Sequence, residues 1–193
     1  MLAKTAMQTY SGKAFDLANP TSEMITIEDI AHHLSLINRF TGATTVPYNV
    51  ADHSLRVMEL VESIDPQHAL AALLHDSQEA YLGDVSSPLK RIPEMAGYKA
   101  REKALQRLIF AKYGISPHIP EVVKAADLVM LNNEAHGLCE PLNPEVWNRW
   151  NLPAPLTEFA PPLPSELAER LFLENFVRLD SKRHGPAKDG FSM

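Results

Sequence analysis

Apolar residues recur every three or four positions along most of the chain, which is the pattern of helices that bury one side. The pattern predicts helices over about 26–41, 49–63, 65–82 and 94–113, one from 119–121 onward, and one over 165–179. No stretch alternates convincingly between apolar and polar residues as a half-buried strand does. The sequence therefore predicts an all-α fold.

Local signals mark where several of these helices begin and end. Thr26 precedes Asp29 by three residues, which resembles the spacing of a capping box. Pro66 suits the first turn of a helix, where its missing N–H leaves no bond unmade. Gly83 is expected to stop the helix that Pro66 opens. These signals predict one continuous helix over 65–82.

A chain of 193 residues is long enough for one domain with a sizeable core. We expect a single-domain helical bundle over 1–180, with its core at about 26–138, an irregular segment over 1–25 and a disordered tail over 181–193. The segment 141–164 holds seven of the 15 prolines. It is therefore expected to be a Pro-rich C-terminal loop that wraps the surface, either covering a site or building an oligomer contact.

Charge and cysteine usage limit the classes of function. A formal net charge of −6 argues against a broad nucleic-acid-binding surface, although a few local cations would still hold a small anion. The single cysteine, Cys139, excludes an internal disulfide and a cysteine-based zinc site. No apolar run approaches the roughly 20 residues that span a bilayer, and the N-terminus lacks the apolar core of a signal peptide. We therefore expect a cytoplasmic protein with no membrane association.

The pair His75-Asp76 lies in an apolar segment, where an unpaired charge would be costly. His53 is on the apolar side of its own predicted helix, and Asp127 interrupts another apolar stretch. A divalent metal ion would satisfy all four side chains, since it binds neutral imidazole nitrogen and carboxylate oxygen directly. The alternative is a set of core histidines and capping aspartates that are satisfied by hydrogen bonds.

Two imidazoles and two carboxylates make a mixed site that suits a first-row ion such as Co²⁺, Mn²⁺, Zn²⁺ or Fe²⁺. Such a site leaves positions for water and substrate. A second metal would need more histidines between Asp76 and Asp127, and only His118 lies there. One divalent metal ion is therefore predicted.

Two further acids are candidates for proton transfer. Glu79 follows His75 by four residues and Asp76 by three, so a regular helix would present all three on one face. Its alternative role is a solvent-facing salt bridge. Asp84 follows Gly83 and would either orient a water or substrate hydroxyl, or cap the next turn. The spacing alone favours neither role of Asp84.

An anionic substrate also needs cations close to the metal. Lys90 lies in a proline-fixed segment just after the helix that carries Glu79, and Arg39 lies near the end of the first helix. Either residue would pair with a phosphate. Phe40 would stack on a base. The alternatives are two solvated charges and a core aromatic.

The order His53, His75-Asp76, Asp127 resembles the HD-domain phosphohydrolase superfamily, which is all-helical and metal-dependent. The segment 75–90 is similar to the signature of the bacterial 5′-deoxynucleotidase branch. The segments 47–54 and 39–42 resemble the phage- and prophage-encoded members, some of which are deoxynucleoside triphosphate triphosphohydrolases. The resemblance covers about residues 9–135.

This resemblance implies a role for each candidate. His53, His75, Asp76 and Asp127 match the metal ligands, and Glu79 matches the catalytic carboxylate. Asp84 matches a residue that supports it and contacts the sugar region, while Arg39 and Lys90 match phosphate-contacting positions. The 5′-deoxynucleotidase has Trp where this chain has Phe40, so the resemblance does not extend to this position.

The expected function is hydrolysis of deoxynucleoside monophosphates by a metal-activated water. The first alternative is a deoxynucleoside triphosphate triphosphohydrolase that acts, for example, on dATP. The second is a regulatory module that binds metal or nucleotide without catalysis. A cyclic-nucleotide phosphodiesterase is disfavoured, because the histidines of a second metal are missing. The resemblance also leaves open a homo-oligomer.

Overall fold

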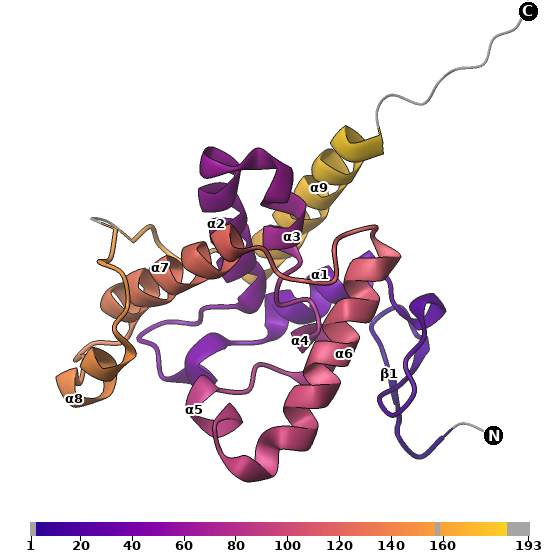
Figure 1. Ribbon diagram of the computed structural model, residues 1–193, viewed down its shortest axis with the longest axis horizontal. Helices are drawn as coiled ribbons and strands as arrows, with labels where there is room; N and C mark the ends of the chain where they lie inside the picture. The colour runs from indigo at the N-terminus through magenta and orange to yellow at the C-terminus, as the bar shows by residue number, and fades with distance from the viewer. Residues whose placement is uncertain (1–2, 157–158, 185–193) are drawn as a thin grey trace, which may run out of the picture.

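Helices dominate the computed structural model, which describes residues 3–156 and 159–184 (Figure 1). The longer helices are α1 (Ile27–Leu36), α2 (Val50–Ile64), α6 (Ala96–Lys112), α7 (Glu121–Leu138) and α9 (Ser165–His184). The shorter helices are α3 (Ala69–Leu73), α4 (Glu79–Leu82), α5 (Ser87–Lys90) and α8 (Pro144–Trp147). The prediction of an all-α fold is confirmed.

Helix α2 lies at the centre of the packing. It contacts α1, α3, α7 and α9, and α9 in turn packs on α1 and α3. Buried hydrophobic side chains form one continuous cluster that reaches from Phe15 near the N-terminus to Leu179 in α9. The chain is therefore one domain, as predicted. Helix α8 lies at one end of the molecule and the N-terminal strands lie at the other (Figure 1).

The N-terminal segment is a correction to the sequence analysis. It contains a short antiparallel hairpin of β1 (Ala6–Gln8) and β2 (Ala14–Asp16). Strands of three residues are too short to show an alternating pattern. The hairpin is held by tertiary contacts instead. Phe15 stacks on Tyr81 with ring centroids 4.0 Å apart, and the Ser11 backbone N–H donates to Asp29 across 2.6 Å.

The first helix begins as predicted, because the Asp29 backbone N–H donates to the Thr26 hydroxyl across 3.1 Å. It ends at Leu36 rather than near residue 41. The Arg39 N–H donates to the Tyr48 carbonyl across 2.8 Å, and this pairing across the chain replaces the helical hydrogen bonds. The chain then turns through Arg39–Gly42 as a 3-10 helix.

The predicted helix over 65–82 is wrong in its middle. The chain forms a 3-10 turn, then α3, then a tight turn over 74–78, and then α4. A continuing α-helix would bond the Ala72 carbonyl to the Asp76 N–H. In the structure the His75 Nδ1–H takes that carbonyl across 2.7 Å, and the following hydrogen bonds tighten, with the Glu79 N–H donating to the Asp76 carbonyl. The His75 backbone N–H also donates to this carbonyl, across 3.4 Å, so the ring and a tighter turn together replace the bond of a continuing helix.

The C-terminal part agrees with the prediction only in outline. The Pro-rich segment is mostly irregular, but it contains α8 and a 3-10 turn over Asn148–Trp150. Helix α9 extends to His184, so the predicted tail is wrong for 181–184 and its remainder lies outside the described residues. None of the described helices has the length and apolar character that crossing a membrane requires.

A surface ion pair between α2 and α9 gives a testable pH dependence. The two Arg178 terminal nitrogens lie 2.6 and 2.7 Å from the two Glu62 carboxylate oxygens. Arg178, together with Lys182, lowers the Glu62 pKa from 4.5 to about 2 against an opposing effect of burial. Because the folded pKa is depressed, the stabilisation is present above pH 4.5 and is lost as the pH falls toward 2.

We expect Glu62→Gln to lower the free energy of unfolding by about 0.5–1 kcal/mol at pH 7, the range for a partly exposed pair. At pH 3 the effect should shrink by at least half. Urea unfolding of parent and variant at both pH values checks this. An equal effect at the two pH values would contradict the assignment to this ion pair.

Candidate functional site

Three separate parts of the chain bring metal-type ligands together. Helix α2 supplies His53, the turn over 74–78 supplies His75, and α7 supplies Asp127. The His53 Nε2 lies 3.3 Å from the His75 Nε2 and 3.2 Å from the Asp127 Oδ1. All three ligand atoms lie within 4.8 Å of one another. His53, His75 and Asp127 therefore form a group able to hold a metal ion.

The hydrogen bonds of the two rings fix their tautomers. The His53 Nδ1–H donates to the Glu134 carboxylate across 2.6 Å, and the His75 Nδ1–H donates to the Ala72 carbonyl across 2.7 Å. In the neutral rings both Nε2 atoms thus carry lone pairs, and they face each other beside carboxylates. All these atoms offer lone pairs and none offers a proton, so only a cation can satisfy them together. These ligand atoms therefore fit a divalent metal.

Asp76 borders the same cluster. Its Oδ2 lies 3.2 Å from the His75 Nε2, 3.6 Å from the His53 Nε2 and 3.7 Å from the Arg39 Nη1. Burial raises the pKa of Asp76, but its cationic neighbours outweigh burial and hold that pKa well below its usual range. Asp76 therefore remains an ionised carboxylate within reach of the two imidazoles.

The raised pKa of His53 shows that its surroundings also favour a positive charge at this position. Burial and Arg39 both lower it, but Glu134 and Asp127 outweigh them and raise the pKa of His53 to about 9. Without a metal ion, the carboxylates therefore hold a proton on this imidazole. A bound metal would take the place of that proton.

Glu134 is a site residue that the sequence analysis missed. Its fully buried carboxylate accepts hydrogen bonds from His53, from the Tyr48 hydroxyl at 2.7 Å and from the Arg39 Nε–H at 3.1 Å. Burial raises the pKa of Glu134, but Arg39 and His53 outweigh burial and lower it. The one available signal was spacing. Glu134 follows Asp127 by seven residues, or two helical turns, and so shares its side of α7.

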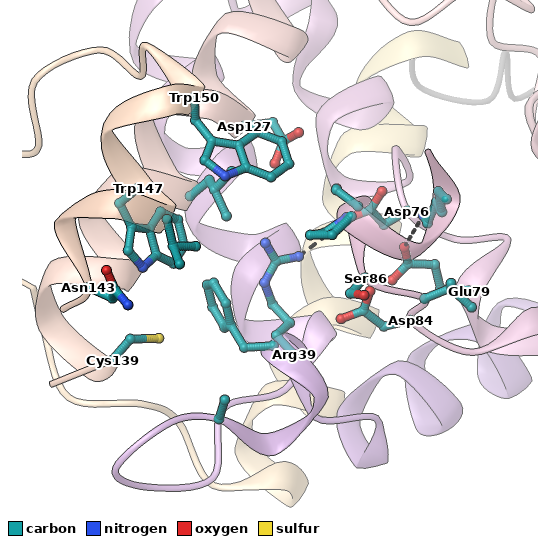
Figure 2. A pocket seen from close by; sticks show the side chains of 18 of the residues that line it. Arg39, Asp76, Glu79, Asp84, Ser86, Asp127, Cys139, Asn143, Trp147 and Trp150 are labelled. Atoms are coloured by element: carbon teal, nitrogen blue, oxygen red, sulfur yellow. Dashed lines mark ion pairs between the residues drawn. The ribbon is translucent and has the colours of Figure 1, made fainter. Parts of the chain in front are cut away.

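A cavity of about 640 Å³ opens beside the metal-type ligands (Figure 2). Asp76 and Asp127 line it and so connect it to the two histidines. All the other candidates from the sequence line it as well, namely Arg39, Phe40, Glu79, Asp84 and Lys90. The structure thus brings all nine candidate residues into one region.

Glu79 lies on the cavity wall although α4 and His75 do not belong to one regular helix. Its side chain is only 5% exposed, which excludes the solvent-facing alternative. The Oε2 is buried and accepts no hydrogen bond from the described part of the chain. Burial, followed by the charges of Asp76 and Asp84, raises the pKa of Glu79 well above its usual value. Such a carboxyl group is suited to exchange a proton with a ligand.

Lys90 and Asp84 lie next to Glu79. The Lys90 Nζ lies 2.6 Å from the Glu102 Oε1 and 3.6 Å from the Glu79 Oε1, so Lys90 is not the solvated charge of the alternative reading. Burial raises the pKa of Asp84. The residue immediately before α5 is Ser86, so Asp84 does not occupy the capping position of that helix.

Arg39 and Phe40 approach the cavity from a strained turn. Arg39 is buried and bridges Glu134 and Asp76, which excludes a solvated charge. Phe40 lines the cavity and is not part of the buried core of the described chain, so the core-aromatic alternative is wrong. Phe40 and Thr41 have φ angles of 56° and 55°, a left-handed conformation that is costly for both residues.

Comparison with known proteins places the chain in a family whose matched members are uncharacterized. No family model matches the chain. The uncharacterized protein YfdR of Escherichia coli strain K12 is 39% identical over 132 residues, which cover 68% of this chain and 71% of YfdR. This chain belongs to the YfdR family. An uncharacterized protein of Rhodobacter capsulatus is also 39% identical, over 135 residues that cover 65% of this chain and 68% of that protein.

Proposed function

We propose that this protein is a metal-dependent phosphohydrolase of the HD-domain type that acts on deoxynucleoside monophosphates. The observation that carries the proposal is the convergence of His53, the His75-Asp76 pair and Asp127 at the end of a cavity. The order of these residues resembles the HD-domain superfamily, and their geometry gives that resemblance a physical basis.

His53, His75, Asp76 and Asp127 would hold one divalent ion, with Co²⁺, Mn²⁺ and Zn²⁺ suited to the mixed nitrogen and oxygen set. When bound, such an ion acidifies water and polarises phosphoryl oxygens. Among the described residues, His53, His75 and Asp127 form one group of this kind. Glu134 would hold the His53 ring with its Nε2 turned toward the site.

Glu79 would exchange a proton with the attacking water through its Oε2. Glu79 lines the cavity, and its Oε2 is buried with no hydrogen-bond partner among the described residues, so a water or substrate hydroxyl that reached this atom would supply the missing partner. Lys90, 3.6 Å from the other carboxylate oxygen, would keep Glu79 in place. Asp84, on the same wall, would contact the sugar region.

The phosphate would lie near Arg39 and Lys90, which are the two cations that line the cavity. Five acids line it too, namely Asp76, Glu79, Asp84, Asp127 and Glu140. Because the acids outnumber the cations, a phosphate dianion would meet net negative charge without a divalent ion. The balance of charge therefore supports both a metal ion and a phosphorylated substrate.

The cavity volume supports a second candidate, hydrolysis of deoxynucleoside triphosphates such as dATP. About 640 Å³ lies well within the range of small-molecule sites and accommodates either one or three phosphates. A module that only binds metal or nucleotide is less well supported. Keeping Glu79 buried without a hydrogen bond to its Oε2 costs stability, and binding alone does not require that cost.

Product analysis tests the proposal. Metal-stripped protein is resupplied with Co²⁺ or Mn²⁺ and incubated with the four deoxynucleoside monophosphates and the four triphosphates. We expect orthophosphate from the monophosphates, and none after chelation or in an Asp127→Asn variant. Triphosphate released from a triphosphate substrate would establish the second candidate. Metal binding without release of either product would overturn both enzymatic proposals.

A further inference from the structure

The cavity has two chemically different sides. Its charged side carries Glu79 and Asp84 and its opposite side carries Trp147 and Trp150 (Figure 2). Lys90 also lines the cavity, and its Nζ lies 3.6 Å from the Glu79 Oε1. These are the only two tryptophans of the chain, and both come from the short segment 141–150. We call the cavity-lining residues Pro141, Val146, Trp147 and Trp150 the aromatic wall. A ligand that fills both sides has an anionic end and a flat apolar end.

Contacts with neighbouring side chains hold both indole rings. The Arg91 guanidinium carbon lies 4.1 Å from the centre of the Trp150 ring, a cation–π contact. The Trp147 and Phe40 ring centroids are 6.2 Å apart, with planes inclined at 56°. Both tryptophans are only partly buried. The rings are thus positioned before a ligand arrives and still offer surface to it.

Specific hydrogen bonds keep the segment that carries the aromatic wall in place. The Asn143 side chain accepts from the Glu145 N–H across 3.0 Å and so caps α8. The Arg149 Nε–H donates to the Glu145 carbonyl across 2.7 Å. The Asn132 amide, on α7, donates to the Pro153 carbonyl across 2.7 Å and ties the segment to the helix that carries Asp127. The first two bonds order the segment locally, and the third anchors the chain just after Trp150 to α7.

We propose that Trp147 and Trp150 bind the nucleobase of the substrate by stacking. This inference rests on the proposed function and adds the part of the site that recognises the base. Stacking accepts any base, because every base has a π face. The aromatic wall therefore tolerates all four bases and favours the purines, which offer the larger stacking area.

Tryptophan fluorescence tests this proposal without catalysis, because both tryptophans line the cavity. Metal-free protein is titrated with deoxyadenosine, deoxyguanosine, deoxycytidine and thymidine, and separately with deoxyribose 5-phosphate. We expect saturable quenching by the nucleosides, strongest for the purines, and none by the sugar phosphate. Trp147→Phe and Trp150→Phe each keep a ring and leave one reporter, so they show which tryptophan contacts the base.

Steady-state kinetics of the metal-loaded protein provide the second test. Trp147→Ala and Trp150→Ala should each raise the KM for a deoxynucleoside monophosphate about tenfold, the usual effect of losing a stacked ring. The KM for deoxyribose 5-phosphate should change less than about twofold, since that substrate has no base to stack. The two Phe variants should stay within about threefold of the parent.

The outcomes separate this proposal from the proposed function. Phosphate release by the parent protein, together with no nucleoside quenching and unchanged KM values in the Ala variants, would overturn base stacking and leave the phosphohydrolase intact. Nucleoside quenching in a protein that releases no phosphate from any nucleotide would overturn the phosphohydrolase. The aromatic wall would then stand as a nucleoside-binding surface.

Discussion

Glu79→Gln is expected to lower phosphate release from deoxynucleotides by about 10²–10⁴-fold, the usual contribution of a positioned acid–base group. The variant keeps the shape of the side chain and removes its ability to take up a proton. Glu79 is not among the residues that form the metal-type cluster, so the affinity for Co²⁺ should remain close to that of the parent. Initial rates and calorimetric metal titration, made on the same preparation, check the two halves of this prediction.

Glu102→Gln is the matched control for Glu79→Gln. Glu102 also contacts Lys90, at 2.6 Å, but it does not line the cavity. Its variant should change the rate by less than about tenfold, since it removes a carboxylate that supports Lys90 and not one that meets the ligand. A Glu79→Gln protein with the parent rate would eliminate Glu79 from the proton transfer. Loss of metal binding in that variant would instead make Glu79 a ligand.

Glu134→Gln is expected to weaken metal binding by about 10–100-fold, although Glu134 would not touch the metal. Gln keeps an oxygen that accepts from His53 and Tyr48, but it removes the charge that faces Arg39. Within the described chain, the buried Arg39 guanidinium would then have one remaining ion pair, with Asp76 at 3.7 Å. Breaking a buried ion pair costs about 3–5 kcal/mol, so the metal-free variant should also unfold at much lower urea concentration.

The control for Glu134 is Glu62→Gln. That variant also takes a carboxylate away from an arginine, but on the surface between α2 and α9. It should leave metal affinity unchanged within measurement error. If Glu134→Gln had the metal affinity and the urea midpoint of the parent, Glu134 would have no role in metal binding or stability. The orientation of His53 would then come from packing alone.

The sequence was sufficient to find the buried cluster, because burying a charged pair such as His75-Asp76 demands a partner. The position of His53 on the apolar side of α2 correctly predicted that its side chain is buried. The break between α3 and α4 could not be predicted, since the helical period continues through it. At that break the His75 ring donates a hydrogen bond to the Ala72 carbonyl, an interaction that the helical period does not encode.

The sequence analysis missed two other features for different reasons. A glutamate in a helix is by default solvent-exposed, so Glu134 gave no compositional signal. The Pro-rich segment has no period from which a direction could be deduced. Its path follows from distant contacts such as that between Asn132 and the Pro153 carbonyl. Composition indicated an irregular segment but not which of its side chains would reach the cavity.

The two sides of the cavity differ in how freely they can change. The charged side carries Glu79 on α4, whose neighbouring residues Ala80 and Tyr81 belong to the hydrophobic core, so substitutions there disturb folding. The aromatic wall belongs to 141–150, and no residue of 141–156 contributes to that core. Substitutions in this short segment therefore reshape one side of the cavity at little cost in stability. Ligand preference can diverge among relatives while the acids and histidines stay the same.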